Sequence, residues 1–210
     1  MAAGPAAEVP SERASLKPLS RRFCARPSPV VARDLLGRLL VRRDAGGLLV
    51  GRIVECEAYQ EDDPASHSYR GRTPRTEVMF GPPGHLYVYF SYGNHWCCNL
   101  VTGRTGEGSA VLLRAVEPLA GLDVMAIRRG VAAPRLLCAG PGRLTQAFAI
   151  TRAENGLDLT MDQDVFLSAG KRIPEDRVGT SPRVGISSGR DRPWRFFEAG
   201  SPFVSRGPRA

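Results

Sequence analysis

The sequence predicts a single-domain α+β fold, in which helices surround a curved, mainly antiparallel β-sheet that carries a protruding β-hairpin. Three observations predict this class. Several short segments alternate apolar and polar residues, as half-buried strands do. Glycine-rich turns join neighbouring strand segments, which favours antiparallel pairing. The helical segments are few and short, so strands dominate the predicted architecture.

Length and composition agree with one globular domain. The chain has 210 residues, of which 42% are apolar and 24% are charged, and this size supports a real core. No apolar run reaches the ~20 residues that a membrane helix needs, and the N-terminus lacks the apolar segment of a secretory signal. We expect a disordered tail over 1–18, which has little to bury, a folded domain over 19–206 and a short tail over 207–210.

The first elements are a short helix and a hairpin. Ser28 and Pro29 are typical of an N-cap and a first helical position, and Gly37 is typical of a stop, so we expect a helix over 29–36. Two apolar segments then flank the turn sequence at 44–47, which predicts a β-hairpin.

The rest of the chain continues this mixture of strands, loops and short helices. In order, the sequence predicts a polar loop over 60–77, hairpin strands over 86–90 and 95–101, a glycine-rich turn at 103–108, a strand over 109–118, helices over 119–129 and 140–150 with Pro141 near the first position of the second, and short strands near 164–168, 183–187 and 194–198.

The charge points to a polyanionic partner. Formal net charge is +8, with an isoelectric point of about 9.8. Of the 29 basic residues only Lys17 and Lys171 are lysine, which leaves 27 arginines. A genome rich in G and C explains arginine over lysine, but it does not explain the excess of basic over acidic residues. Because the guanidinium group forks onto phosphates, nucleic acid is the expected partner.

The five cysteines stand at positions 24, 56, 97, 98 and 138. Their number is odd and no CxxC spacing occurs, which argues against a disulfide framework and against a zinc ribbon. We interpret them as small buried apolar residues of a reducing cytoplasm, and metal ligation is the less favoured alternative.

A possible site begins on the strand that ends "IVECEAY". Alternation places Ile53, Glu55, Glu57 and Tyr59 on one face. If that face borders a pocket, the Tyr59 ring can hold a flat substrate while a carboxylate works beside it. A half-exposed strand with solvated glutamates is the simpler alternative, and this stretch by itself favours it.

Neighbouring strands add aromatic and polar groups. Tyr87 and Tyr89 share a face, and with Tyr59 they can form a box that stacks on a planar ring, although ordinary core tyrosines give the same pattern. Leu112 and Arg114 share a face of another strand. An arginine inside an apolar strand needs an anionic partner.

The partner hairpin strand places His95, Cys97 and Asn99 on one face. The other histidines, His67 and His85, lie on different segments, so the histidines have no metal-ligand spacing and we expect polar or backbone-bonding roles. The chain has no GxGxxG, P-loop or GxSxG sequence.

The hairpin between these strands has an unusual tip. Its turn is Ser91-Tyr92-Gly93-Asn94, whereas turn tips usually consist of Gly, Asn, Asp or Ser. A large aromatic ring is unexpected at such an exposed position.

These segments together resemble the alkyladenine (3-methyladenine) DNA glycosylases of the methylpurine type, and the chain is similar to a bacterial member. The resemblance extends over roughly residues 24–206, and it rests on "ARDLLGRLLV", "GRIVECEAY", "ASHSYRG", "TPRTEVMFGPPGHLYVYFSYGNHWCCN", "AVLLRAVEPLAGL", "LCAGPGRLTQAFAI" and "FFEAGSPFVS".

The resemblance implies a monofunctional enzyme of base excision repair. Such an enzyme flips a damaged purine out of the duplex and hydrolyses its glycosidic bond with water, which leaves an abasic site. It implies that Glu57 is the general base and that Arg114 lies near the water. The resemblance assigns the remaining roles as follows: Tyr59, His67 and Tyr89 as walls around the flipped base, Asn99 as the group that crowds the 2-amino group of guanine, and Tyr92 as the wedge that fills the gap in the duplex. Tyr87 and Leu112 complete the expected base pocket.

The remaining expectations concern DNA and cofactors. Arg70, Arg72, Arg75 and Arg143 are candidates for phosphate contacts, together with the first amides of the 141–150 helix. The expected partner is double-stranded DNA that contains damaged purines. We expect a monomer without membrane attachment, metal or cofactor, in the bacterial cytoplasm at the nucleoid.

Two other functions remain open at this point. The first is a non-catalytic protein that binds damaged DNA or structured RNA on the same scaffold. The second is a formyltransferase-like accessory barrel, which fits a similar fold but gives no reason for the tyrosine at position 92. Glu57 separates enzyme from binder, because a carboxylate repels phosphates and a simple binder has no use for it.

Overall fold

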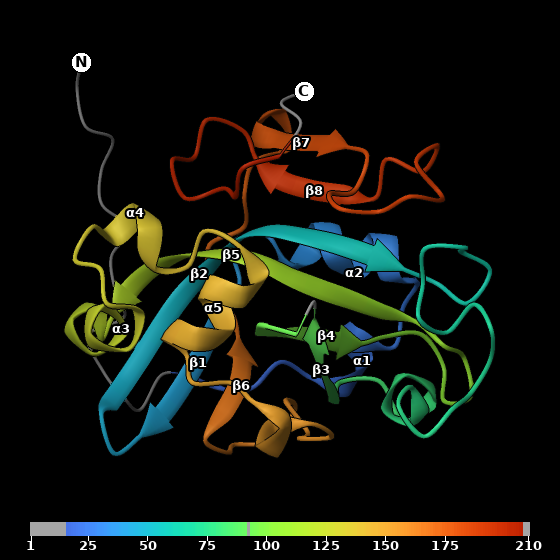
Figure 1. Cartoon of the computed structure of the whole chain (residues 1–210), viewed down its shortest axis with the longest axis horizontal. Coiled ribbons are helices and arrows are strands. Elements are labelled where there is room, and N and C mark those ends of the chain that lie inside the picture. Colours follow the sequence, from blue (N-terminus) through green and yellow to red (C-terminus); the bar gives the residue numbers. More distant parts are fainter. Residues whose placement is uncertain (1–15, 92, 208–210) are drawn as a thin grey trace.

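The computed structural model describes residues 16–91 and 93–207 of the chain, and it has the predicted α+β architecture (Figure 1). One sheet holds every named strand of these residues, and all of its strand pairs are antiparallel. Its strands are β1 (Leu39–Asp44), β2 (Gly47–Tyr59), β3 (Leu86–Ser91), β4 (His95–Val101), β5 (Ala110–Ala120), β6 (Val165–Ser168), β7 (Val178–Ser181) and β8 (Arg195–Glu198).

Short helices accompany this curved sheet. They are α1 (Arg21–Cys24), α2 (Ser28–Leu35), α3 (Leu122–Arg129), α4 (Pro134–Leu137) and α5 (Pro141–Ala147), with 3₁₀ turns η1 (Glu77–Phe80), η2 (Arg152–Glu154) and η3 (Glu175–Arg177). α2 packs against β2, β5 and β8, whereas α5 packs against β4 and β5. The helices α2 and α5 therefore fix the central strands β2, β4 and β5 on which the candidate site is built.

The strand order is β3-β4-β5-β2-β1-β6. In addition, β8 pairs with both β2 and β7. β2 is the centre of the sheet, because it pairs with β1, β5 and β8 along different parts of its length. β3 and β4 pair from Leu86↔Leu100 to Ser91↔His95, as expected for a hairpin. Its turn includes residue 92, which lies outside the described residues, so the protrusion of this turn stays a prediction.

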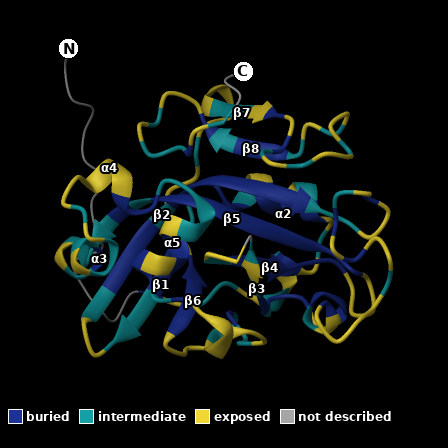
Figure 2. Cartoon of the chain, viewed as in Figure 1, coloured by how far each residue is buried: buried dark blue, intermediate teal, exposed yellow. Residues whose placement is uncertain are grey.

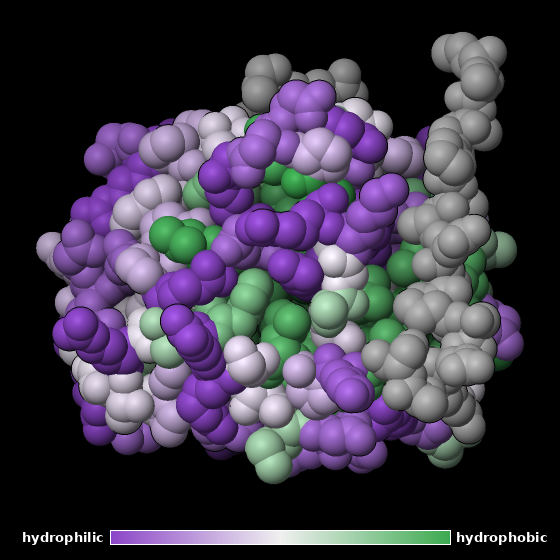
Figure 3. Space-filling model, turned by 180° about the vertical axis from the view of Figure 1, so that it is seen from behind, coloured by the Kyte–Doolittle hydropathy of each residue, from purple (hydrophilic) through white to green (hydrophobic). Residues whose placement is uncertain are grey.

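In the described part of the chain, the core consists of one main apolar cluster and two smaller ones. The central strands are buried along most of their length while the loops are exposed (Figure 2). All five cysteines are free and buried, as the apolar interpretation requires. Seen from behind, the surface is mainly hydrophilic, and hydrophobic residues show between the polar ones (Figure 3). No helix among the described residues has the length and apolar character needed to cross a membrane.

The three predicted helices are present, and two of them are shorter than predicted. α2 spans Ser28–Leu35, one residue earlier at each end than predicted, and Pro27 is its N-cap instead of Ser28, while Pro29 lies in its first turn. The expected helix over 119–129 begins only at Leu122, because β5 continues to Ala120. Gly121 separates the two elements with a φ of 73°, and a Cβ atom there would lie 2.9 Å from the carbonyl oxygen of Leu48. The expected helix over 140–150 ends at Ala147.

The strand predicted near 183–187 is wrong. The strand of this region is β7, which ends at Ser181 and pairs with β8, and residues 183–187 form turns and bends. Pro182 has no N–H to donate to a ladder. The N–H of Val184 instead donates to the carboxylate of Glu57, so the segment takes part in the site and not in the sheet.

The folded region starts within the segment that was expected to be a tail. Leu16 is buried in a small cluster with Leu39, Val41 and Phe166, and Pro18 forms a bridge to Ser168. Residues 1–15 and 208–210 lie outside the described residues, so most of both expected tails stays a prediction.

Candidate active site

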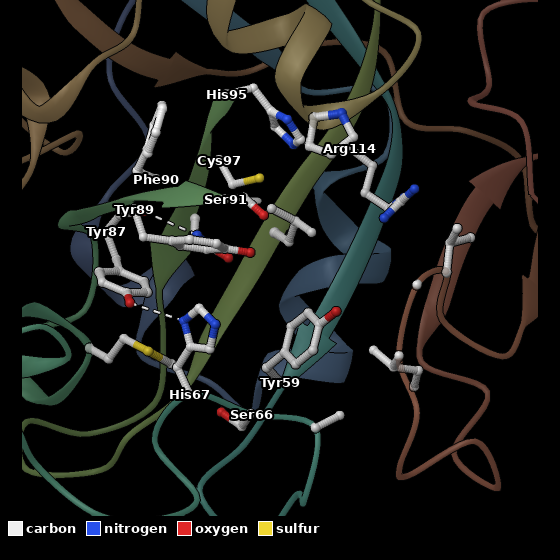
Figure 4. Close-up of a pocket in the computed structure, with 18 of the residues that line it drawn as sticks. Tyr59, Ser66, His67, Tyr87, Tyr89, Phe90, Ser91, His95, Cys97 and Arg114 are labelled. Atoms are coloured by element: carbon white, nitrogen blue, oxygen red, sulfur yellow. Dashed lines mark hydrogen bonds between the residues drawn. The ribbon is translucent and has the colours of Figure 1, made fainter. Parts of the chain in front are cut away.

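A cavity of about 590 Å³ opens on one side of β2, β3, β4 and β5 (Figure 4). Two loops, over 65–75 and 184–186, complete its wall. Its lining combines aromatic, polar and cationic side chains: Tyr59, Ala65, Ser66, His67, Arg75, Met79, Tyr87, Tyr89, Phe90, Ser91, His95, Cys97, Asn99, Leu112, Arg114, Pro141, Val184, Gly185 and Ile186. This composition suits a flat molecule with polar edges.

Strand register brings four of the predicted residues into one row. Tyr87 lies opposite Asn99, Asn99 opposite Leu112, and Leu112 opposite Glu57. Directly opposed residues point to the same face of a sheet. Tyr87, Asn99 and Leu112 line the cavity, and the row ends in the fully buried Glu57. The shared faces predicted for β3, β4 and β5 are correct, because the residues predicted to lie together on each of these strands all line the cavity.

The carboxylate of Glu57 is held by three groups that all line the cavity. Oε1 accepts the Val184 N–H at 2.7 Å. Oε2 accepts the Tyr59 hydroxyl at 2.9 Å and lies 3.2 Å from Nη1 of Arg114. A carboxylate offers about four lone-pair positions, so one acceptor position remains after these three contacts.

Arg114 joins Glu57 to a second buried glutamate. Its Nε donates to Oε1 of Glu55 at 2.9 Å. Glu55 also accepts from Nε of Arg195 at 2.7 Å and from the N–H of Ser205 at 2.7 Å. Burial lowers the pKa of Arg114, but Glu57 and Glu55 outweigh burial and raise that pKa above the ordinary arginine value. The prediction that Arg114 needs an anionic partner is confirmed.

The shared face predicted for β2 is wrong at one residue. The register of β2 with β5 shifts between Ile53 and Glu55 and again between Glu55 and Cys56. Ile53 therefore packs in the main apolar core with Cys56 and Ala58, away from Glu57. A bulge inserts an extra residue and reverses the alternation, and no glycine or turn residue between Ile53 and Cys56 marks it.

The aromatic residues meet at one wall. The ring centroids of His67 and Tyr89 are 4.5 Å apart, and those of Tyr87 and Tyr89 are 5.5 Å apart. Nδ1 of His67 and the Tyr87 hydroxyl are hydrogen-bonded at 3.0 Å. Nδ2 of Asn99 donates to the carbonyl oxygen of Tyr87 at 3.1 Å, which fixes the amide at the cavity floor.

These rings are uncharged at neutral pH. Burial raises the pKa of Tyr59, and the negative charge of Glu57 raises it further. Burial also raises the pKa values of Tyr87 and Tyr89. For His67, burial and the nearby Arg75 lower the pKa below the ordinary 6.5. The cavity therefore presents neutral aromatic faces to its contents.

The four candidate phosphate ligands are all exposed, but they occupy different positions. Arg75 lines the cavity, and its guanidinium lies 5.6 Å from the centre of the Tyr89 ring. Arg72 pairs with Glu77 and lies over Phe80. Arg143 borders a shallow depression of about 380 Å³ beside Asn94 and His95, near the β3–β4 turn. Tyr92, the predicted wedge, lies outside the described residues.

Sequence reasoning missed the loop that completes the site. Val184, Gly185 and Ile186 line the cavity, and Arg183 forms a buried ion pair with Asp63. The basic and small residues of this segment resembled an ordinary strand with a turn. Its position beside the cavity depends on contacts with residues more than a hundred positions earlier, for which the sequence carries no local signal.

All three histidines form polar contacts, as expected, and two of these contacts are with residues close in the chain. His85 bonds the carbonyl oxygen of Pro82, and His95 bonds the side chain of Asn94. Within the part of the chain that the structure describes, no group of three or more His, Cys, Asp or Glu side chains is arranged to hold a metal ion.

Comparison with known proteins defines the class. The profile of the methylpurine-DNA glycosylase family matches residues 22–202, which is most of the chain. The chain belongs to this family, and membership places it among the glycosidases of DNA repair.

Individual relatives agree with this assignment. A protein of Carboxydothermus hydrogenoformans is 48% identical over 90% of this chain and 98% of its own length. One of Nitrosospira multiformis is 51% identical over 84% and 88%, and one of Rhodopseudomonas palustris (strain HaA2) is 50% identical over 94% of each chain. All three carry the name "Putative 3-methyladenine DNA glycosylase".

Proposed function

We propose that this chain is a monofunctional DNA glycosylase that flips alkylated, deaminated or etheno purines out of duplex DNA and hydrolyses their glycosidic bond with water. The observation that carries the proposal is the buried Glu57 carboxylate, held by Tyr59, Val184 and Arg114 at the edge of an aromatic cavity. Family membership supports the reaction class.

Glu57 is the general base in this proposal. Its remaining acceptor position takes a proton from a water molecule at the cavity edge. Arg114 lies beside the other carboxylate oxygen, Oε2, and its charge balances the carboxylate. The negative charge of Glu57 also stabilises the cationic sugar that develops as the base departs.

The neutral aromatic rings bind the flipped base. Tyr59, His67 and Tyr89 line one cavity and offer faces for stacking. A cationic alkylated purine gains more than a neutral one from such faces, because a cation is attracted to an aromatic quadrupole. Asn99 and Leu112 then limit which groups fit on the purine edge, and Asn99 is the group that excludes the 2-amino group of guanine.

Water is the nucleophile and no lyase step follows. A glycosylase that also cuts the strand uses an amine, typically from lysine. Lys17 and Lys171 are both exposed, and neither lines the cavity. Because no lysine is near the reacting sugar, the product is an intact strand with an abasic site.

Extrusion of the base leaves a gap, which costs a few kcal/mol of lost stacking and pairing. Tyr92 fills this gap as a wedge at the β3–β4 turn, an inference that rests on the sequence. Arg70, Arg72, Arg75 and Arg143 contact phosphates on a monomeric enzyme. With ~4–6 phosphates neutralised, the slope of log affinity against log salt is about −4 to −5.

The test is excision from duplex oligonucleotides that carry one hypoxanthine, one ethenoadenine or a methylated purine, followed by alkaline cleavage of abasic sites. We expect wild type to excise at least one of these bases. Glu57→Gln lowers the single-turnover rate by about 10²–10⁴-fold and retains DNA binding. Glu117→Gln is the matched control, because this carboxylate of β5 pairs with Arg52 and does not line the cavity.

Tight, damage-dependent binding by wild type without excision of any of the three bases contradicts the proposal. That result favours the non-catalytic binder of damaged DNA. Equal loss of excision in Glu57→Gln and Glu117→Gln contradicts the role of Glu57 as general base.

A further inference from the structure

The loop over 182–193 is fastened to the loop over 60–66 by a buried ion pair. Arg183 and Asp63 have fully buried side chains. Nη2 of Arg183 donates to Oδ1 of Asp63 at 2.9 Å, and Nη1 donates to the other carboxylate oxygen. The same guanidinium donates to the carbonyl oxygens of Ala58 at 2.9 Å and Gly189 at 3.1 Å. One side chain thereby links the end of β2 to both loops.

Arg183 is linked to two of the three groups that hold Glu57, one through its guanidinium and the other through the backbone. The guanidinium lies over the Tyr59 ring, with its central carbon 4.6 Å from the ring centre. The next residue in the chain is Val184, whose N–H donates to Oε1 of Glu57. A displacement of Arg183 therefore moves both the Tyr59 hydroxyl and the Val184 amide relative to the carboxylate.

Global stability is a poor explanation for such a pair. Burial of two charges costs several kcal/mol of desolvation, and apolar residues of similar volume often serve equally well. The backbone at Gly189 nevertheless lies so close to the pair that it leaves no room for a side chain. Gly189 has a φ of +64°, and a Cβ atom there would lie 2.7 Å from Oδ1 of Asp63 and 2.8 Å from Nη2 of Arg183.

A second pair joins the same two loops at the surface. Arg192 donates to both carboxylate oxygens of Asp62 at 3.0 Å, and the Asp62 side chain is 70% exposed. The Arg192 guanidinium lies over Trp194 and not over Tyr59. This outer pair, Asp62–Arg192, therefore links the same two loops as the inner pair, Asp63–Arg183. It makes no direct contact with the groups that hold Glu57.

We propose that the Asp63–Arg183 pair is a positioning device that aims the Tyr59 hydroxyl and the Val184 N–H at Glu57. The proposal rests on the proposed function, in which Glu57 activates water. Neither member of the pair lines the cavity, so both act through Tyr59 and Val184 and not on the substrate.

The test compares two double variants with matched chemistry. Asp63→Asn/Arg183→Met removes the inner pair and leaves no unpaired buried charge, while Asp62→Asn/Arg192→Met makes the same change in the outer pair. The inner variant slows single-turnover excision by about 10–100-fold, because misplacement of a catalytic group by ~1 Å has an effect of that order. Its affinity for damaged duplex stays within about threefold, and the outer variant keeps its rate within about twofold.

A structural readout accompanies the rates. In ¹⁵N-valine-labelled protein the Val184 amide proton resonates downfield, because it donates to a carboxylate at short distance. The signal moves upfield in the inner variant, as it does in Glu57→Gln, and stays in place in the outer variant. Arg183→Lys retains the positive charge but not the two-pronged guanidinium, so its excision rate lies between those of wild type and the inner double variant. If the inner double variant does not fold, Arg183→Lys is compared with wild type in its place.

The positioning role also predicts non-additive rates. Tyr59→Phe removes one of the contacts that Arg183 orients, so the inner variant slows excision less in that background than in wild type. Equal losses from inner and outer variants, additive rates, or an unmoved Val184 signal each overturn the inference. Failure of wild type to excise any damaged purine contradicts the proposed function, and the Val184 signal still tests the positioning.

Discussion

The guanidinium of Arg114 lies against the carboxylate of Glu57, with Nη1 3.2 Å from Oε2. Its Nε donates at the same time to the buried Glu55. Glu55 and Glu57 of β2 therefore share the guanidinium of Arg114 on β5. Glu55 also pairs with a second arginine, Arg195. The formal charges of these four buried side chains balance, which offsets part of the desolvation cost of burying them.

Removal of the Glu55 carboxylate leaves this cluster of buried charged side chains with an excess of positive charge. We expect Glu55→Gln to lower the free energy of unfolding by about 3–5 kcal/mol, because Arg195 and Arg114 each lose an ionic partner. Urea denaturation measures the change. Glu117→Gln, which removes a half-buried partner of Arg52, serves as the control with a change of about 0–1 kcal/mol. Equal changes in both variants contradict a special role for the cluster.

Tyr59→Phe separates the two contributions of this residue. The ring stays available to the cavity, but the hydroxyl that donates to Glu57 at 2.9 Å is lost. We expect single-turnover excision to slow by about 10-fold, since a hydrogen bond to a charged group contributes about 1.5–3 kcal/mol. Affinity for damaged duplex, measured by fluorescence anisotropy, stays unchanged. Loss of affinity with an unchanged rate contradicts this division.

His67 makes stability depend on pH in a defined direction. Its pKa in the folded protein is lowered from 6.5 by burial and by Arg75, so the unfolded chain binds the proton more readily. The resulting contribution to stability is fully present above pH 6.5 and is lost as the pH falls through the lower folded value. NMR titration locates that value, and His67→Gln removes this part of the pH dependence. A titration midpoint above 6.5 contradicts the prediction.

Salt dependence tests the contacts assigned to phosphates. We expect Arg143→Gln to weaken binding of duplexes regardless of sequence and to reduce the salt slope by about 1. Arg143 is exposed beside the β3–β4 turn. Arg172→Gln is the control, because Asp34 already balances that exposed arginine. The same decrease in slope from both variants indicates a diffuse effect of net charge and not a phosphate contact at Arg143.

Much of the site was predictable from strand patterns. Alternation placed Tyr87 beside Tyr89 and Leu112 beside Arg114 on common faces, and the cavity contains all four. Such patterns succeed because side-chain direction in a regular strand depends only on position. The bulge of β2 near Glu55 broke that rule, and for this reason the predicted position of Ile53 failed.

In the C-terminal part of the chain, local sequence patterns no longer predict the structure. Residues 183–187 have the composition of a strand, but Pro182 and the buried Arg183 end the pairing there. The contact of Val184 with Glu57 spans 127 positions, and that of Arg183 with Asp63 spans 120. No periodicity within either segment encodes such a partner.

The sequence by itself determined the fold class, the basic character and most of the strand faces. These properties follow from composition and from periodicities of a few residues, which local geometry dictates. The residues proposed for catalysis came from the family resemblance of the sequence and not from these patterns. The tertiary structure alone decided how Glu57 is held, because its partners come from β2, β5 and a loop near the C-terminus. The orientation of a buried carboxylate depends on hydrogen bonds between segments that only the completed sheet brings together.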